Sequence, residues 1–306
     1  QGRTGPKEEG ITMPRSIRPS ITRRSVLAGS LVSAVALALT ACGSKNSSGG
    51  STGGSVKGIE VKDGVATITI GATPQPHVTI LQWVQDNLAA GVGLSLDIKE
   101  IDDYQTPNTS LDDGSLAANF YQTPNFLKQQ IEEKGYDFVS IADVHIEPMG
   151  IYTSKGYTSV DQAASGGTVV LNSDPANTAR GLKLLQTAGL ITLDPSVEIP
   201  SDLDVTANSK NLKFVTVDGA QVAASMADAE LAVINGNYAL QAGLVPSRDA
   251  LVLEPGEHSP YANELVVRTA DKDNEHLVKL AGLMNSPELK AYIEQTWTDG
   301  SVIPAF

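Results

Sequence analysis

From residue 65 to the C-terminus, short segments with a strand pattern alternate with longer segments that have a helical pattern. Residues 65–71 alternate apolar and polar side chains, which predicts a strand. The apolar residues of 80–88 recur at helical spacing and predict a helix that ends near Gly91. Strands are further predicted at 94–101, 136–142, 168–171, 212–217, 231–234 and 265–268, and helices at 175–188, 274–284 and 286–296. This alternation is typical of an α/β protein with mainly parallel sheets, and we expect that fold class.

Cys42 is the only cysteine in the sequence, and it lies where an apolar run gives way to a polar one. Arg23 and Arg24 precede the apolar run at 26–41, which is shorter than the roughly 20 residues of a membrane span. A basic region followed by a short apolar one is typical of an export leader. The sequence Leu-Thr-Ala-Cys at 39–42 resembles the lipobox of bacterial lipoproteins, in which the cysteine receives a diacylglyceryl group. We therefore expect residues 1–41 to be a removed leader and Cys42 to carry the lipid.

Glycine and serine dominate residues 43–55 and predict a flexible tether with a root-mean-square reach of about 20 Å. We assign 42–57 to the lipidated cysteine and this tether. Some alternatives stay open: an ordinary secretory leader whose cysteine is incidental, and a twin-arginine signal at 22–27 in place of the general export route. Residue 1 is Gln and Met13 opens an ordinary leader, so residues 1–12 can lie upstream of the true start.

The expected mature chain is strongly acidic. The whole sequence carries a net charge of −13 and the leader +4, which leaves −17 on residues 42–306. Such a chain repels phosphate backbones, so we expect no nucleic-acid partner. With no cysteine beyond Cys42, the stability must come from a packed core. We expect a protein held to the cell membrane by its lipid and exposed on the extracytoplasmic side, with no cofactor.

A series of short segments follows in order from residue 65 to the end. The segments are Gly71-Ala-Thr-Pro74 with Pro76-His77, Asp103-Tyr104 with Pro107-Asn108, Leu111-Asp-Asp-Gly114, Asn119-Phe-Tyr-Gln122, His145-Ile-Glu-Pro-Met-Gly-Ile-Tyr152, Asp174-Pro175 with Asn177 and Arg180, Ala232-Val-Ile-Asn235 with Asn237-Tyr238-Ala239, Ser259-Pro-Tyr261 and Ile303-Pro-Ala-Phe306. Together they resemble the methionine-binding lipoproteins of ABC importers (NlpA type).

This resemblance implies a two-lobed fold like that of type II periplasmic binding proteins, with a hinge and a central ligand cleft. We expect residues 58–148 and 246–306 to form the first lobe and residues 149–245 the second. It also implies a non-catalytic, monomeric binding protein that delivers methionine or a related amino acid to the permease and ATPase subunits of an importer.

Arg180 lies one to two turns into a predicted helix, which Asp174 and Pro175 are well suited to open. An amino acid presents a carboxylate, which a guanidinium and the first amides of a helix bind well. From the residues alone, a solvated helix arginine is the plainer interpretation. The resemblance implies that Arg180 clamps the ligand carboxylate.

Asn235 follows the apolar segment 231–234, at the carboxyl end of a predicted strand, where the clefts of parallel sheets bind ligands. Its side-chain oxygen can accept a hydrogen bond from a ligand ammonium. An asparagine before Gly236 is also a common turn residue. The resemblance implies that Asn235 contacts the ligand, and it adds Asn237 as a second candidate.

Tyr104, Tyr121 and His145 match pocket positions of the family, where an aromatic lining suits a thioether. Thr123 lies two residues beyond Tyr121 in a presumed extended segment, hence on the same face. The chain departs from the family here, since Thr123 stands where histidine is usual, Tyr121 where phenylalanine is usual and Gln75 where glycine is usual. The added hydroxyls predict a more polar pocket. The ligand is left open among L-methionine, D-methionine, a short methionine peptide and another amino acid.

The histidines at 77, 145, 258 and 276 have no close His or Cys partner in the sequence, so no metal site is predicted. Paired carboxylates at 112–113 and 132–133 are expected to be solvated. No phosphate-loop or dinucleotide motif is present in the sequence. The alternatives to a binding protein are a lipid-anchored hydrolase and a surface adhesin.

Overall fold

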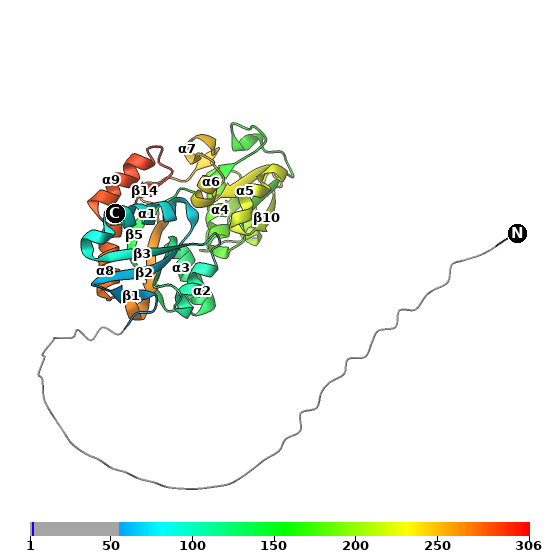
Figure 1. The fold of residues 1–306 in the computed structure, drawn as a ribbon. Coiled ribbons are helices and arrows are strands. Elements are labelled where there is room, and N and C mark those ends of the chain that lie inside the picture. Colours follow the sequence, from blue (N-terminus) through cyan, green and yellow to red (C-terminus); the bar gives the residue numbers. More distant parts are fainter. Residues whose placement is uncertain (1, 3–54) are drawn as a thin grey trace, which may run out of the picture. The chain divides into compact units, whose positions relative to one another are not determined.

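Two β-sheets, each covered by helices, organise the part of the chain that the computed structural model describes, which is residue 2 and residues 55–306 (Figure 1). Residues 55–306 lie in one compact unit. The predicted leader, the predicted lipidation site Cys42 and most of the predicted tether lie outside the described residues.

The first sheet has the strand order β1-β2-β4-β13-β5-β14, and β3 is a further strand, outside this order, that pairs with β2. Its strands are β1 (Ile59–Lys62), β2 (Val65–Ala72), β3 (Leu94–Glu100), β4 (Ala118–Gln122), β5 (Phe138–Ile146), β13 (Ala262–Arg268) and β14 (Ile303–Pro304). β2 runs antiparallel to β1 and parallel to β3 and β4, with Ile70 opposite Ile98 on β3 and Ala118 on β4. The strands predicted at 65–71 and 94–101 are confirmed.

The second sheet has the strand order β10-β7-β11-β6-β12. Its strands are β6 (Gly150–Tyr152), β7 (Thr168–Asn172), β10 (Lys213–Val217), β11 (Leu231–Ile234) and β12 (Val252–Leu253). A separate pair joins β8 (Thr192–Leu193) to β9 (Val205–Ala207). The strands predicted at 168–171, 212–217 and 231–234 are confirmed to within one residue.

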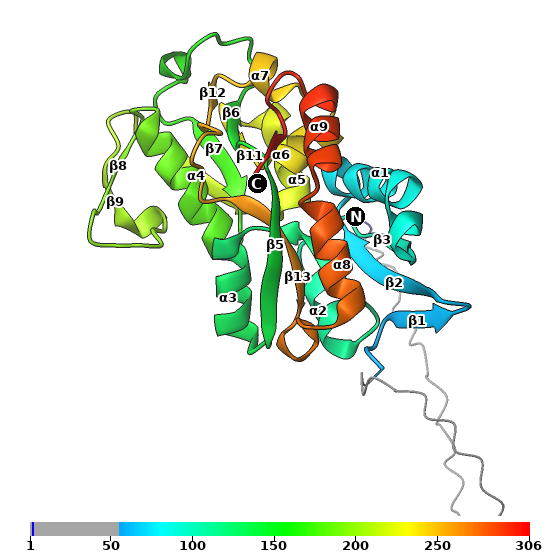
Figure 2. The same ribbon diagram turned by 90° about the vertical axis from the view of Figure 1, so that its left-hand side faces the viewer.

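The helices pack on the faces of these sheets (Figure 2). They are α1 (Thr79–Asn87), α2 (Thr106–Asp113), α3 (Pro124–Lys134), α4 (Pro175–Thr187), α5 (Gly219–Ser225), α6 (Gly236–Gln241), α7 (Pro246–Asp249), α8 (Glu275–Met284) and α9 (Pro287–Thr296). Short helical turns lie at Pro74–Val78, Ala89–Val92, Val160–Gln162, Asp202–Asp204, Met226–Asp228 and Thr269–Asp271. The helices predicted in the regions of α1, α4, α8 and α9 are confirmed.

The predicted α/β fold class is therefore confirmed, but the expectation of mainly parallel sheets is wrong. In the described residues, parallel pairing joins β2 to β3 and β4, and β7 to β10 and β11, while the other paired strands are antiparallel. The cause is the path of the chain between the sheets. β5 leads out of the first sheet and β13 returns beside it, and strands that run in opposite directions pair without a crossover helix.

Two linkers connect the sheets. The outgoing linker, residues 147–149, leads from β5 to β6, and the return linker, residues 254–261, leads from β12 to β13. We call the first sheet with its helices the first lobe and the second sheet with its helices the second lobe. The sequence places the return to the first lobe at residue 246, whereas β12 still pairs with β6 in the second sheet. A two-residue strand is too short for its apolar pattern to be recognised in the sequence.

The two linkers are hydrogen-bonded to each other. The amide of Met149 donates to Glu254 Oε2 at 2.8 Å, and the amide of Glu254 donates to the Met149 carbonyl at 2.9 Å. The crossing point between the lobes is therefore a short two-stranded connection.

Each lobe has its own hydrophobic core. In the first lobe, the buried side chains of Ile68 and Ile70 on β2 pack with Leu81 of α1. In the second lobe, α4 approaches β7 and β11 closely because it carries Gly181. A methyl group at that position would lie 2.9 Å from the Leu171 side chain. Each fully buried aliphatic side chain contributes about 1.5–3 kcal/mol, so each core stabilises its own lobe.

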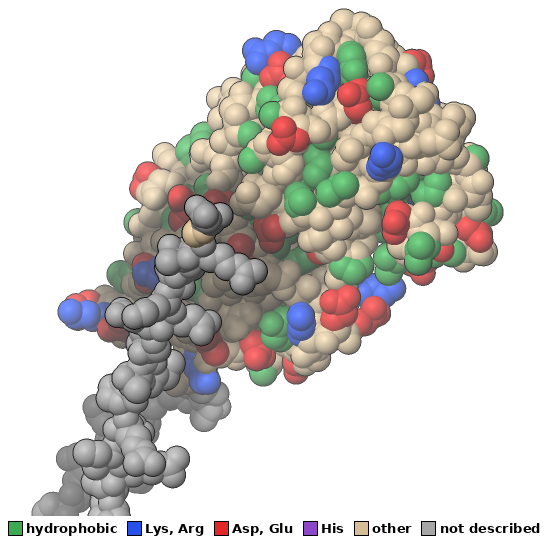
Figure 3. Space-filling model, turned by 90° about the vertical axis from the view of Figure 1, so that its right-hand side faces the viewer, with side chains coloured by type: hydrophobic (Ala, Val, Ile, Leu, Met, Phe, Trp, Pro, Cys, Tyr) green, Lys and Arg blue, Asp and Glu red, His purple; other side chains and the backbone are tan. Residues whose placement is uncertain are grey.

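The surface of the described residues mixes charged and apolar side chains. On the face in Figure 3, acidic and basic side chains are interspersed with hydrophobic ones. Among the described residues, no helix combines the length and the apolar character that a membrane span requires.

Glu264 on β13 generates a pH-dependent prediction. Burial raises the pKa of Glu264 to about 7, and the nearby Asp143 carboxylate adds to the rise. The folded protein keeps this proton up to about pH 7 while the unfolded chain loses it near the ordinary value of 4.5. The stability therefore falls as the pH rises from 4.5 to 7. We expect Glu264→Gln to raise the free energy of unfolding at pH 8 by up to about 3 kcal/mol, and much less at pH 5.

Urea unfolding at the two pH values measures this difference, and Glu60→Gln, at an exposed position, is the matched control. An equal gain at pH 5 and pH 8 would show that burial does not raise the pKa of Glu264.

Candidate functional site

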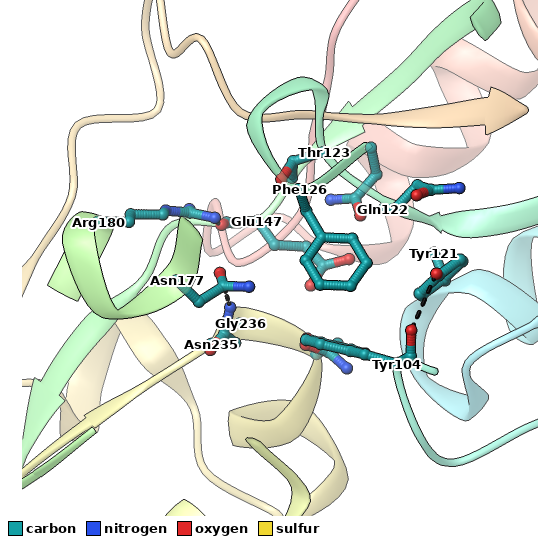
Figure 4. A pocket seen from close by; sticks show the side chains of 12 residues that line it. Tyr104, Tyr121, Gln122, Thr123, Phe126, Glu147, Asn177, Arg180, Asn235 and Gly236 are labelled. Atoms are coloured by element: carbon teal, nitrogen blue, oxygen red, sulfur yellow. Dashed lines mark hydrogen bonds between the residues drawn. The ribbon is translucent and has the colours of Figure 1, made fainter. Parts of the chain in front are cut away.

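A small cavity lies between the two lobes, beside the outgoing linker (Figure 4). Its lining residues are Tyr104, Tyr121, Gln122, Thr123, Phe126, Glu147, Asn177, Arg180, Asn235, Gly236, Asn237 and Asn263. Its volume is about 20 Å³, which is room for about one water molecule. Six of the seven side chains that the sequence assigns to ligand binding line this cavity, and their contact with a ligand stays a prediction.

Arg180 is buried, with 4% of its surface exposed, so the solvated interpretation does not apply. The helix that carries it begins as predicted, because the Asp174 carboxylate accepts a hydrogen bond from the Asn177 amide. Arg180 Nε donates to Glu254 Oε1 at 3.0 Å and Nη2 donates to Glu254 Oε2 at 2.5 Å. Burial lowers the pKa of Arg180, but the Glu254 carboxylate outweighs that effect and holds the pKa above its ordinary value.

The guanidinium also contacts both linkers. Arg180 Nη2 donates to the main-chain oxygen of Glu147 at 3.0 Å, and the Tyr261 ring centroid lies 4.1 Å from the guanidinium carbon. Among residues 55–306, the hydrogen bonds of Arg180 come from Nε and Nη2. Nη1 is therefore the guanidinium nitrogen that has no hydrogen bond to these residues.

The two asparagines at the start of α6 differ in what they offer. The Asn235 oxygen accepts from Asn172 at 3.3 Å and its nitrogen donates to Asn177 at 2.7 Å, so both ends of the amide have protein partners. The Asn237 oxygen accepts from the Tyr104 hydroxyl at 2.6 Å. Its nitrogen is buried and has no partner among the described residues. A buried donor without a partner costs about 1–3 kcal/mol. Asn237 is therefore better placed than Asn235 to donate a hydrogen bond to a ligand.

Aromatic rings form the opposite wall. The ring centroids of Tyr104, Tyr121 and Phe126 lie 5.7–5.9 Å from one another. The Tyr121 hydroxyl donates to the Tyr104 carbonyl at 3.0 Å, and the Thr123 hydroxyl donates to Asn125 at 2.7 Å. The added hydroxyls therefore have protein partners, and the more polar pocket that the sequence predicts stays a prediction. The wall presents ring surface, which suits an apolar ligand side chain.

His145 is the exception among the predicted site residues, because it does not line the cavity. It is completely buried on β5, and its ring lies 4.8 Å from that of His77 and 5.2 Å from that of Phe120. Glu147, two residues further along, takes the place at the cavity and accepts from His145 Nε2 at 2.6 Å. His145 therefore lies behind the cavity wall and is positioned to hold Glu147.

The structure also brings His77 to this cluster, which the sequence does not predict because 68 positions separate the two histidines. His77 Nε2 faces two oxygens, Asn263 Oδ1 at 3.0 Å and Glu147 Oε1 at 3.3 Å, so it carries the proton. Its Nδ1 then accepts from the Thr73 hydroxyl at 2.8 Å. For His145, a proton on the unpartnered Nδ1 would be an unpaired buried donor, so Nε2 carries the proton and donates to Glu147.

Burial lowers the pKa of His77 to about 4 and that of His145 to about 3, so both rings are neutral at neutral pH. The ligating atoms of His77, His145 and Glu147 lie within 4.8 Å of one another. In the hydrogen-bonded arrangement, however, the Nε2 atoms that face the carboxylate carry protons and offer no lone pair to a metal. The predicted absence of a metal site stays a prediction.

Six lining residues are missed by the sequence assignment: Gln122, Phe126, Glu147, Asn177, Gly236 and Asn263. Glu147 and Asn177 belong to the quoted segments, but a carboxylate and an amide in these places are also common at turns and helix starts. Asn263 comes two residues after the quoted Tyr261, on a strand that the sequence predicts to begin only at residue 265.

Two α/β lobes joined by two linkers, with a cavity between them, are typical of the type II periplasmic-binding-protein fold, as predicted. The chain belongs to the NlpA lipoprotein family, whose model matches residues 68–306. The family membership that the sequence segments indicate is thereby confirmed.

The similar proteins are named as binding proteins. The chain is 34% identical over 286 residues to the methionine-binding lipoprotein MetQ of Bacillus subtilis (strain 168), which covers 92% of this chain and 98% of that protein. A solved ABC transporter periplasmic substrate-binding protein from Coxiella burnetii is 39% identical, with a TM-score of 0.74 and coverage of 78% of this chain and 100% of that one. A nutrient-binding protein from Burkholderia cenocepacia, solved bound to methionine, is 37% identical, with a TM-score of 0.75 and the same coverage.

Gly236 generates a prediction on the architecture of the site. A methyl group there would lie 2.6 Å from Glu147 Cβ and 3.2 Å from the Pro148 carbonyl, so only glycine lets α6 approach the outgoing linker. We expect Gly236→Ala to lower the free energy of unfolding by about 1–3 kcal/mol through overpacking.

Gly282→Ala is the control, because the added methyl on α8 meets no atom within 4 Å and a helical alanine is more stable by about 0.5–1 kcal/mol. Urea unfolding of both variants checks the pair. A neutral or stabilising effect of Gly236→Ala would contradict the close packing of α6 on the linker.

Proposed function

We propose that this chain is a lipid-anchored solute-binding protein of an ABC importer, which binds methionine or a related amino acid between its lobes. The observation that carries the proposal is the cavity itself. It sets a buried guanidinium and an unpartnered amide of the second lobe against aromatic rings of the first. The methionine-bound neighbour and the named relatives support the same function.

In this proposal, Arg180 Nη1 and Asn237 Nδ2 donate to the ligand carboxylate. Charge-assisted hydrogen bonds from a planar guanidinium are about twice as strong as neutral ones. The rings of Tyr104, Tyr121 and Phe126 enclose the ligand side chain, with Thr123 at the edge of the wall. Asn235 holds Asn177 in place at the start of α4, and its contact with the ligand is indirect.

The size of the cavity implies that the lobes move. Ligand pockets usually measure about 300–1,000 Å³, far above the cavity of about 20 Å³ in this closed arrangement. Tyr104 closes the cavity by donating from the first lobe to Asn237 of the second. A ligand enters when the lobes separate at the linkers, and this contact is then replaced by contacts with the ligand.

Delivery to a permease fits a protein without catalytic groups in its cavity. None of the hydroxyl groups that line the cavity is hydrogen-bonded to an imidazole. We place the protein at the membrane through the lipid on Cys42, on the extracytoplasmic side, as a monomer that meets the permease and ATPase subunits. Thermal shift with the free amino acids and with methionine dipeptides tests the ligand class, since a ligand of the folded state raises the melting temperature.

Arg180 provides the direct test of the site. We expect Arg180→Lys, which keeps the charge but loses the planar fork, to weaken L-methionine binding by at least about 30-fold in isothermal calorimetry. The double variant Arg180→Gln with Glu254→Gln removes both charges together, so it tests the clamp without leaving a buried carboxylate unpaired.

Arg248→Ala is the matched control, because the Arg248 side chain is 69% exposed and pairs with the neighbouring Asp249. If both Arg180 variants melt like the wild type and bind L-methionine with wild-type affinity, Arg180 does not clamp the ligand.

A further inference from the structure

We propose that the Glu147 carboxylate binds the ammonium group of the ligand and makes a free amino group a requirement for binding. This assignment rests on the proposed function and moves the ammonium contact from Asn235 to a residue of the outgoing linker. The evidence is the position of Glu147, its hydrogen bonds and the balance of charge around it.

Glu147 is 5% exposed, and its side chain lines the cavity together with those of Phe126 and Arg180 (Figure 4). One carboxylate oxygen, Oε1, lies 2.6 Å from His145 Nε2 and 3.3 Å from His77 Nε2. Both imidazoles belong to the first lobe, and Gly236 of the second lobe packs against the Glu147 Cβ. The side chain is therefore fixed from both sides, as a positioned ligand contact requires.

The hydrogen bonds to Glu147 bring no compensating charge. His77 and His145 are neutral at neutral pH, as their lowered pKa values show. The nearest guanidinium, that of Arg180, contacts Glu147 through its main-chain oxygen, while its side-chain pairing is with Glu254. Among residues 55–306, the ion-pair partners of the Glu147 carboxylate are the two histidines alone.

A buried carboxylate without a cation costs several kcal/mol. Burial accordingly raises the pKa of Glu147, although His77, Arg180 and a hydrogen bond from the backbone N–H of Asn237 act in the opposite direction. When Glu147 is ionised, the charges of Arg180, Glu254 and Glu147 leave the site with one excess negative charge. An ammonium group beside Glu147 cancels that charge, and a ligand without it leaves the carboxylate unpaired.

This balance predicts different costs for the two ends of an amino acid. Removal of the ligand carboxylate leaves Arg180 still paired with Glu254, whereas removal of the ammonium leaves Glu147 with no cation. In wild-type protein, we expect 3-(methylthio)propylamine, which lacks the carboxylate of methionine, to bind at least about tenfold more tightly than 4-(methylthio)butanoate, which lacks the amino group.

The variant Glu147→Gln tests the residue itself. We expect it to weaken L-methionine binding at least about 30-fold, while 4-(methylthio)butanoate binds unchanged or more tightly. The dissociation constant of 4-(methylthio)butanoate divided by that of L-methionine therefore falls at least about 30-fold. Glu60→Gln makes the same chemical change at an exposed position and is expected to leave the ratio at its wild-type value.

Isothermal calorimetry at pH 7.5 measures the three ligands, and thermal melting shows that each variant is folded. A merely structural role of Glu147 would weaken both ligands alike, and an unchanged ratio would overturn the assignment. If Glu147→Gln does not fold, the affinities of the wild-type protein for 3-(methylthio)propylamine and 4-(methylthio)butanoate test the assignment. Tighter binding of 4-(methylthio)butanoate would overturn the Glu147 assignment.

Failure of the proposed function gives a different result. Wild-type protein that binds neither L-methionine nor any other amino acid would overturn both proposals. If the wild-type protein binds L-methionine, and the Glu147→Gln variant prefers L-methionine over 4-(methylthio)butanoate as strongly as the wild type does, the Glu147 assignment alone is overturned.

Discussion

The hydrogen bonds of the Arg180 guanidinium are the contacts on which the site depends. They join α4 of the second lobe to both linkers, through the Glu254 carboxylate and the Glu147 carbonyl. A buried guanidinium is tolerated only where a carboxylate compensates it, so the position of α4 and the path of the return linker are fixed together. The absence of a side chain at Gly181 allows this helix to lie close to its sheet. The geometry of the cavity follows from these two constraints.

The linkers do more than connect the lobes, because they also carry the two acidic side chains that set the charge of the site. Glu254 begins the return linker and neutralises Arg180, while Glu147 begins the outgoing linker and is held by imidazoles of the first lobe. In the arrangement we propose, one end of a zwitterion is bound from the second lobe and the other end through a side chain anchored to the first. A ligand of that kind favours the closed form, because only the closed form offers both contacts.

The sequence predicts the fold class, most strands and helices and the segments that meet at the cavity. Local patterns suffice for these, as at Asp174, which caps α4 through its own side chain. What the sequence does not predict depends on contacts between distant residues. The antiparallel return of β13 depends on the path of the chain between two sheets. Glu147, which lines the cavity in place of His145, contacts His77, far away in the sequence. The Asn237 side-chain oxygen binds the distant Tyr104, while its nitrogen has no partner in the described part of the chain.

The nearly filled cavity has a kinetic consequence. With the lobes closed, the space holds about one water molecule, so an amino acid cannot bind to this form directly. Every successful encounter must involve the separated form, and the apparent affinity is reduced by the fraction of molecules in that form. The observed rate of ligand uptake would then level off at high ligand concentration, at the rate at which the empty protein opens. The hydrogen bond between Tyr104 and Asn237 must break in this opening step, so it contributes to the maximal rate of ligand binding.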